Sequence, residues 1–225
     1  MLISHRYKFI YTKTVKTAST SVESFFERFC MPDGEWEATH ARAEYESPTG
    51  VIGFRGKNPP SNTKWLNHMS ARKIKKQVGD DIWNSYFKFC VIRNPYDKCI
   101  SAFEHFGKNH QTKRLSILDR IQTRRMKDEQ LRFYDYIRNN PPIDRDKYII
   151  DNEICVNDFI RYESLQDDIE RICKHIGVPY ESDLLPSFKR GRRRPDATGE
   201  TLYTELSRQK IAKEFAFEID YFGYN

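Results

Sequence analysis

Glycine is absent from the N-terminal part of this 225-residue chain, in which the first glycine is Gly34. A nucleotide-binding loop of the Walker A type needs glycines before its Gly-Lys-Ser/Thr end, so this region excludes that motif. The chain also has no apolar run near the roughly 20 residues of a membrane span. Residues 1–7 lack the apolar segment of a secretory signal peptide. We therefore expect no membrane span and a cytoplasmic location.

Cysteine is scarce, and its spacing matches no metal-binding pattern. The cysteines form an odd-numbered set at positions Cys30, Cys90, Cys99, Cys155 and Cys173. We expect all of them to be reduced thiols in a reducing compartment. No cluster of cysteine and histidine suggests a bound metal, so the sequence predicts chemistry that requires none.

The composition is that of a folded protein with a basic surface. Hydrophobic residues make up 38% of the chain and aromatic residues 14%. This supports one sizeable core, and we expect a single domain over 1–225. The net charge of +6 suits an anionic partner. Charge alone does not choose among nucleic acid, acidic glycans and phosphorylated nucleotides.

Residues 9–21 have the layout of a phosphate-binding turn and read Phe-Ile-Tyr-Thr-Lys-Thr-Val-Lys-Thr-Ala-Ser-Thr-Ser. An apolar strand leads to Lys16, small residues follow, and an amphipathic helix begins near Ser21. Small side chains let the backbone approach an anion, the N–H groups at a helix start point at it, and the lysine adds a positive charge. Alone, the pattern also fits a Ser/Thr helix cap beside a surface lysine.

A second candidate phosphate site follows the apolar strand predicted over 87–92. Arg93 stands where that strand ends, and Ser101 comes eight positions later (101 − 93) on the next predicted helix. Ligands of α/β proteins bind at the carboxyl ends of parallel strands. The donor fork of arginine and the hydroxyl of serine suit a phosphate group. The alternative is that Arg93 pairs with a carboxylate such as Asp97.

Together these segments resemble the sulfotransferases that use 3′-phosphoadenosine 5′-phosphosulfate (PAPS). Residues 16–21 look like the 5′-phosphosulfate loop of that family, and residues 93–101 look like its 3′-phosphate motif. The resemblance covers nearly the whole chain. Further segments are similar to the branch that contains the carbohydrate sulfotransferases, at residues 68–71, 159–165 and 220–224.

The resemblance implies a role for each matched residue. Lys16 would stabilise the departing phosphate oxygen, and His68 would act as the general base. The 5′-phosphosulfate would be held by backbone N–H groups and hydroxyls of the loop Lys16, Thr17, Ala18, Ser19, Thr20 and Ser21. The 3′-phosphate would be held by Arg93 and Ser101, with a late basic element formed by Lys189, Arg190, Gly191 and Arg192.

Some of these roles have alternatives in the sequence. The general base could instead be His40, Glu37 or Glu44. These residues lie in a turn-rich segment over 31–63, which is expected to be one long functional loop. Residues 189–194 could form a solvated basic loop, or bind an acidic acceptor or nucleic acid.

The loop departs from the family pattern at two positions. Val15 stands where the family often has proline, and Ala18 stands where it often has glycine. If Ala18 needs a positive φ, its side chain adds a strain of roughly 1 kcal/mol.

Alternating strands and helices predict an α/β fold, a P-loop-NTPase-like three-layer sandwich with a central, largely parallel sheet flanked by helices. Strands are expected at 7–12, 87–92, 147–151 and 154–161. Helices are expected at 20–30, 70–79, 81–86, 96–107, over 112–139, from a cap at Ser164 or Asp167 to 176, and at 201–217. In the first helix, core positions are assigned by helical spacing to Val22, Phe25, Phe26 and Phe29.

The sequence therefore predicts in-line sulfuryl transfer from PAPS to a hydroxyl, or alternatively an amine, with 3′,5′-adenosine bisphosphate as the product. The acceptor is expected to be a small molecule or a carbohydrate, chosen by residues 31–67 and 108–145, and no nucleic-acid partner is expected. One alternative is a P-loop-type small-molecule kinase that uses ATP, against which stand the missing Walker A glycines and Mg²⁺-binding acid. A weaker alternative is a nucleic-acid-binding protein that uses residues 189–194.

Overall fold

The structure is a computed structural model that describes residues 1–107, 110–112, 117–186 and 199–224. The chain divides into two compact units. Unit 1 comprises Met1–Ile92 with Asp144–Phe188, and unit 2 comprises Arg93–Ile143 with Lys189–Asn225. The single domain over 1–225 stays a prediction.

Unit 1 is built on a six-stranded sheet with the order β3-β4-β1-β2-β5-β8. Its strands are β1 (Leu2–Ser4), β2 (Phe9–Thr12), β3 (Tyr45–Ser47), β4 (Gly50–Ile52), β5 (Phe87–Ile92) and β8 (Asp158–Arg161). The β2–β5 and β5–β8 pairs are parallel, whereas the β1–β2, β1–β4 and β3–β4 pairs are antiparallel. The predicted parallel sheet is thus confirmed only for β2, β5 and β8.

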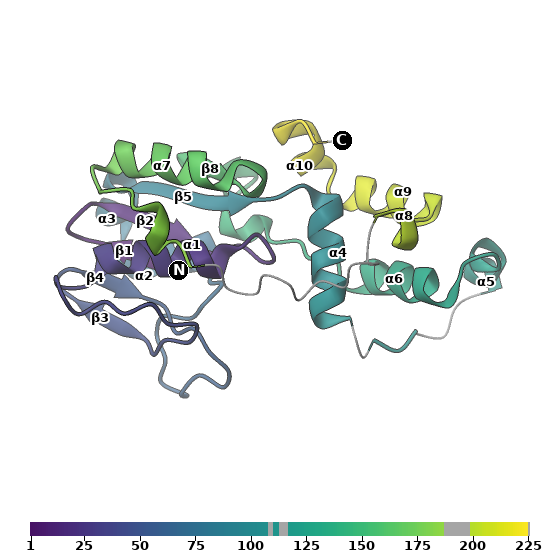
Figure 1. The fold of residues 1–225 in the computed structure, drawn as a ribbon, viewed down its shortest axis with the longest axis horizontal. Helices are drawn as coiled ribbons and strands as arrows, with labels where there is room; N and C mark the ends of the chain where they lie inside the picture. Colours follow the sequence, from purple (N-terminus) through teal and green to yellow (C-terminus); the bar gives the residue numbers. More distant parts are fainter. Residues whose placement is uncertain (108–109, 113–116, 187–198, 225) are drawn as a thin grey trace. The chain divides into compact units, whose positions relative to one another are not determined.

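Helices cover both faces of this sheet (Figure 1). Successive side chains of a strand point to opposite faces, so Phe9 and Tyr11 pack on one side and Ile10 on the other. The first face is covered by α1 (Ser19–Glu27) and α7 (Leu165–Ile176). The second face is covered by α2 (Ala71–Val78) and α3 (Asp80–Ser85). The predicted mixed α/β class, with helices flanking a central sheet, is confirmed.

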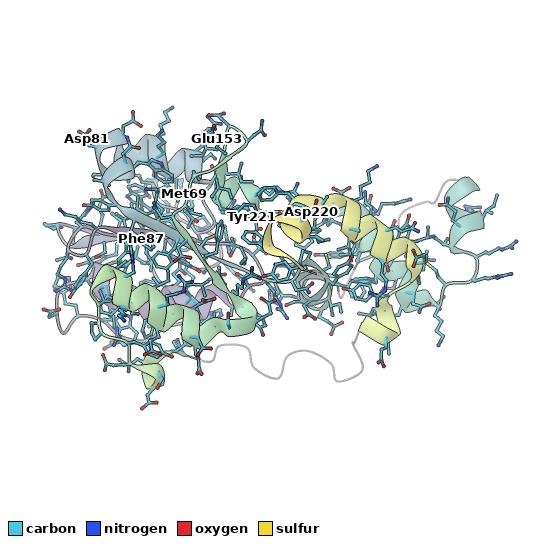
Figure 2. All side chains as sticks on the ribbon, turned by 90° about the horizontal axis from the view of Figure 1, so that it is seen from above. Met69, Asp81, Phe87, Glu153, Asp220 and Tyr221 are labelled. Atoms are coloured by element: carbon cyan, nitrogen blue, oxygen red, sulfur yellow. The ribbon has the colours of Figure 1, made fainter. Side chains whose placement is uncertain are left out.

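The burial of single residues in unit 1 follows the predicted pattern. The core residues predicted for the helix at 20–30 are all buried: Val22, Phe25 and Phe26 lie in α1, and Phe29 lies in the 3₁₀ turn that follows it. Met69 is buried as well, whereas Asp81 and Glu153 are exposed at the periphery (Figure 2). Helix α7 ends at Gly177, whose φ of 71° is the left-handed value that a terminal glycine adopts at low cost.

Several stretches of unit 1 differ from the sequence prediction. Strand β1 was not predicted, and of the strand predicted at 154–161 only Asp158–Arg161 lies in the main sheet. Segment 31–63 was expected to be one long loop, but it contains the β3–β4 hairpin, which adds to the edge of β1. The strand predicted at 147–151 is instead the first half of a small hairpin, β6 (Ile149–Ile150) with β7 (Glu153–Ile154). Its turn residues Asp151 and Asn152 both have a positive φ, which Asp and Asn tolerate better than most residues. Short 3₁₀ turns complete the unit at Arg28–Cys30, Arg145–Lys147, Tyr162–Ser164 and Ser182–Leu184.

The described part of unit 2 is helical. It contains α4 (Pro95–Phe106), α5 (Ile117–Thr123), α6 (Asp128–Asn139), α8 (Gly199–Leu202), α9 (Glu205–Glu214) and α10 (Ala216–Phe222). Its core is formed by residues such as Phe103, Phe133 and Phe215. The described residues of the helical region predicted over 112–139 contain two helices, α5 and α6, and the last predicted helix is divided into three.

The sequence predicts that the cysteines are reduced and that the chain has no membrane span. All of the cysteines are free thiols, as expected. No helix among the described residues has both the length and the apolar character needed to cross a bilayer.

Candidate active site

The segment between β2 and α1 has two non-glycine residues in the left-handed backbone region. Lys16 has a φ of 60°, and Ala18 has φ 57° and ψ 15°. This conformation costs an alanine roughly 1 kcal/mol relative to glycine, so the strain expected at Ala18 is present. Backbone strain of this kind persists where the surroundings enforce it, and it is concentrated at functional sites.

The loop presents unbonded backbone N–H groups at the start of α1. Among the described residues, none accepts a hydrogen bond from the N–H of Thr17, Ala18, Ser19 or Thr20. The next two N–H groups, of Ser21 and Val22, both donate to the carbonyl of Ala18. The first N–H groups of a helix carry partial positive charge and bind anions, especially where the preceding backbone forms a concave turn. This arrangement makes the loop a candidate anion site.

The hydroxyl groups of the loop divide into two sets. Thr14 Oγ1 donates to the carbonyl of Val91 on β5 at 2.6 Å and lies 2.8 Å from Thr17 Oγ1, while Ser19 Oγ donates to the Thr14 carbonyl at 2.6 Å. Thr17 and Ser19 therefore use their hydroxyls to shape the loop. Within the described part of the chain, the hydroxyls of Thr20 and Ser21 make no hydrogen bond.

A buried ionic network lies beside the loop. The Nζ of Lys13 donates to Glu23 Oε2 on α1 at 2.7 Å, and Arg55 donates to the same oxygen at 2.7 Å. Arg55 also pairs with Glu27, which Arg42 contacts at 2.9 Å. Burial alone would raise the pKa of Glu23, but Lys13, the amino group of Met1 and Arg55 together hold it well below its ordinary value. Glu23 is therefore a charged carboxylate that anchors the loop to its helix.

His68 is connected to the same loop. Its Nδ1 lies 3.1 Å from the carbonyl oxygen of Lys13. A carbonyl can only accept, so Nδ1 carries the proton and Nε2 has the lone pair of a base. Burial lowers the pKa of His68 to about 3, with further contributions from the charge of Lys13 and the amino group of Met1. The structure thus joins His68 to the Lys16 loop as a neutral imidazole.

This pKa makes a prediction for the ligand-free protein. The imidazole of His68 should show no titration between about pH 5 and 8 when its carbon-bound protons are followed by NMR. Because the folded-state pKa lies below that of the unfolded chain, the unfolded state binds the proton first. Stability from this residue is present above about pH 6.5 and is lost as the pH falls toward 3. A midpoint near 6.5 for His68 would contradict this environment.

The reserve candidates for the base lie in different surroundings. The carboxylate of Glu44 accepts hydrogen bonds from the backbone N–H groups of Lys64 at 3.0 Å and Trp65 at 2.5 Å. These bonds give Glu44 a structural role. Glu37 and His40 are exposed, and their carbonyl oxygens accept from Arg42 and Arg55 respectively. Among these candidates, His68 is hydrogen-bonded to the loop, through the carbonyl of Lys13.

The predicted 3′-phosphate residues belong to unit 2. Arg93 follows β5 directly, and Ser101 is a half-buried residue of α4. The start of that helix is built as expected: Asn94 accepts the N–H of Tyr96 at 3.0 Å, and Pro95 occupies the first helical position. The late basic element Lys189, Arg190, Gly191 and Arg192 lies outside the described residues.

Three residues near the loop were missed by the sequence analysis. Lys13 and Glu23 form the buried pair, and Asp144 accepts the N–H of Val15 at 2.6 Å. Part of a signal for the first pair existed, because Glu23 and Glu27 stand four apart on one face of their helix, and like charges at that spacing need cations nearby. Asp144 lies 129 positions from Val15, and no local pattern indicates that contact. No group of side chains able to hold a metal ion is present among the described residues.

Comparison with known proteins agrees with this geometry. The chain is 31% identical over 117 residues to an uncharacterised protein of Archaeoglobus fulgidus, a match that covers 52% of this chain and 88% of the relative. No solved structure matches it. The model of the protein family described as "Sulfotransferase family" matches residues 1–225. The chain therefore belongs to the sulfotransferase family.

Proposed function

We propose that the protein transfers the sulfuryl group of PAPS to a hydroxyl acceptor, or alternatively to an amine, and releases 3′,5′-adenosine bisphosphate. The observation that supports this most is the run of N–H groups from Thr17 to Thr20, beside Lys16, which have no acceptor among the described residues. These donors suit an anion such as the 5′-phosphosulfate of PAPS. Membership of the sulfotransferase family supports sulfuryl transfer as the reaction.

In the proposed mechanism, the acceptor oxygen attacks sulfur in line with the bond from sulfur to the phosphate oxygen. As that bond breaks, negative charge grows on the phosphate oxygen, and Lys16 with the loop N–H groups stabilises it. The acceptor proton passes to Nε2 of His68, whose Nδ1–H is held by the Lys13 carbonyl. A bound anionic donor favours the imidazolium form, so it raises the pKa of His68 when a base is needed.

The other end of the nucleotide is assigned to Arg93 and Ser101. An arginine fork just before α4 and a hydroxyl in the middle of that helix suit the 3′-phosphate, with Lys189, Arg190, Gly191 and Arg192 as additional basic contacts.

Replacing Arg93 with alanine should raise the KM for PAPS by about tenfold to a hundredfold, because a charge-assisted contact to the phosphate is lost. The KM for the acceptor should change by less than about threefold if Arg93 binds only the donor. Steady-state kinetics with each substrate varied in turn would measure both values. The exposed Arg125 supplies the matched control as Arg125→Ala. An Arg93→Ala protein with a raised KM for the acceptor and an unchanged KM for PAPS would contradict the assignment.

The acceptor class is proposed from the family branch. Residues 68–71, 159–165 and 220–224 resemble the branch with carbohydrate sulfotransferases, which favours a sugar hydroxyl over another small molecule. The experiment is incubation with ³⁵S-labelled PAPS and a panel of sugars, phenols, lipids and amines, followed by identification of the labelled product. The two alternatives, an ATP-dependent kinase and a nucleic-acid-binding protein, gain no support from the family match.

A further inference from the structure

An acidic side chain is hydrogen-bonded to the backbone of the candidate anion loop. The carboxylate of Asp144 accepts the N–H of Val15 through Oδ2 at 2.6 Å. Asp144 is only 3% exposed, and it stands at the start of the 3₁₀ turn Arg145–Lys147 in unit 1. The bond therefore joins two parts of unit 1 that are distant in sequence, directly before the residue proposed to assist the leaving group.

The position of this carboxylate needs a reason, because its charge opposes the binding of an anion close by. Val15 offers a backbone N–H that is half-buried, and a buried donor without an acceptor is costly. A carboxylate acceptor forms a strong, charge-assisted bond with that N–H. The following residues, Lys16 and Ala18, both hold a left-handed backbone that their side chains disfavour. A firm attachment directly before Lys16 helps to enforce that conformation.

We propose that Asp144 is a positioning residue for the anion loop, which it holds through Val15 in the shape that presents the N–H groups of Thr17 to Thr20. The proposal rests on the proposed function for its meaning in catalysis, but the shape of the loop can be tested without any ligand. It also explains the valine at this position. Proline has no N–H and a fixed φ, so a proline here would need no acceptor and would restrain the loop by itself.

The test uses four variants: Asp144→Ala, Asp144→Asn, Val15→Pro, and Asp144→Ala combined with Val15→Pro. The first readout is the dissociation constant for 3′,5′-adenosine bisphosphate, measured by calorimetry. The second is amide hydrogen exchange at Ser21 and Val22 in the ligand-free protein, because both N–H groups donate to Ala18 within the loop. The two readouts separate loop shape from nucleotide binding.

Asp144→Ala should raise the dissociation constant for 3′,5′-adenosine bisphosphate by about tenfold or more, since one charge-assisted bond is lost. It should speed amide hydrogen exchange at Ser21 and Val22 by a similar factor. Asp144→Asn keeps an acceptor oxygen and should stay within about threefold of the natural protein in exchange. Val15→Pro alone should weaken binding, because the proline ring takes the place of the N–H beside Asp144 and leaves that buried carboxylate without its donor. Added to Asp144→Ala, it should restore most of the loss, because alanine leaves room for the ring and the ring restrains φ. This rescue is the diagnostic result, because a role of Asp144 through its other contacts would not respond to a change at Val15.

An Asp144→Ala loss that Val15→Pro leaves unchanged would overturn the proposal, as would unaltered exchange in Asp144→Ala. If the Val15→Pro variants do not fold, Asp144→Asn is compared with Asp144→Ala. An equal loss of hydrogen-exchange protection in these two variants would reject the role of Asp144 in the loop. A natural protein that does not bind 3′,5′-adenosine bisphosphate would reject the proposed function. The exchange results would still decide whether Asp144 shapes the loop.

Discussion

Replacing Lys16 with alanine is expected to lower kcat by about 10²–10³, the scale of removing one donor that stabilises charge in a transition state. The lysine side chain is partly exposed and belongs to a loop whose buried anchors are other residues. Its loss should therefore leave the fold intact and remove a charge that matters most as the leaving oxygen becomes negative. Single-turnover kinetics with saturating PAPS would isolate this step from product release.

Two controls make the Lys16 result specific. Lys57→Ala removes an exposed lysine of the same unit and should leave turnover within about twofold. An unchanged unfolding midpoint for Lys16→Ala would show that the loss is not a loss of folded protein. Normal turnover in a folded Lys16→Ala protein would refute the assigned role.

The largest effect on stability is expected from Glu23→Gln, at about 3 kcal/mol or more. Glu23 accepts from both Lys13 and Arg55, and all three side chains are buried. The amide keeps the shape of the side chain but removes its charge, so the ammonium of Lys13 is left buried without its ionic partner. Urea unfolding at pH 7 would measure the difference in the free energy of unfolding, with the exposed Glu153→Gln expected within about 0.5 kcal/mol.

The same pair gives the pH dependence a definite sign. The pKa of Glu23 is depressed in the folded state, so its contribution is present above the unfolded value of about 4.3 and is lost as the pH falls below it. The stability difference between the natural protein and Glu23→Gln should therefore narrow below about pH 4. A difference that stayed constant down to pH 3 would show that Glu23 does not act through its charge.

Local patterns predicted the parts of the fold that local physics determines. Strand β5 has the predicted limits, because an apolar run bounded by a turn proline leaves little ambiguity. The antiparallel strands β1, β3 and β4 were not predicted, since their pairing depends on a sheet edge that is distant in sequence. The glycines and prolines around the β3–β4 hairpin made its short strands indistinguishable from loop.

The candidate site was predictable to a similar extent. The Lys16 loop could be found because strand, small residues and helix are consecutive, and the strain at Ala18 follows from its departure from glycine. The supports of the loop could not be found in the same way. Lys13, Glu23, Arg55 and Asp144 meet only in the folded chain, where burial converts ordinary surface residue types into a bonded network.

The most direct measurement of the central claim is equilibrium binding of 3′,5′-adenosine bisphosphate and of ATP with Mg²⁺ to the natural protein, by calorimetry. The account predicts that the bisphosphate binds and that ATP with Mg²⁺ binds far more weakly. It also predicts that Lys16→Ala and Arg93→Ala each raise the dissociation constant for the bisphosphate. Preferential binding of ATP with Mg²⁺, or no binding of the bisphosphate, would contradict it.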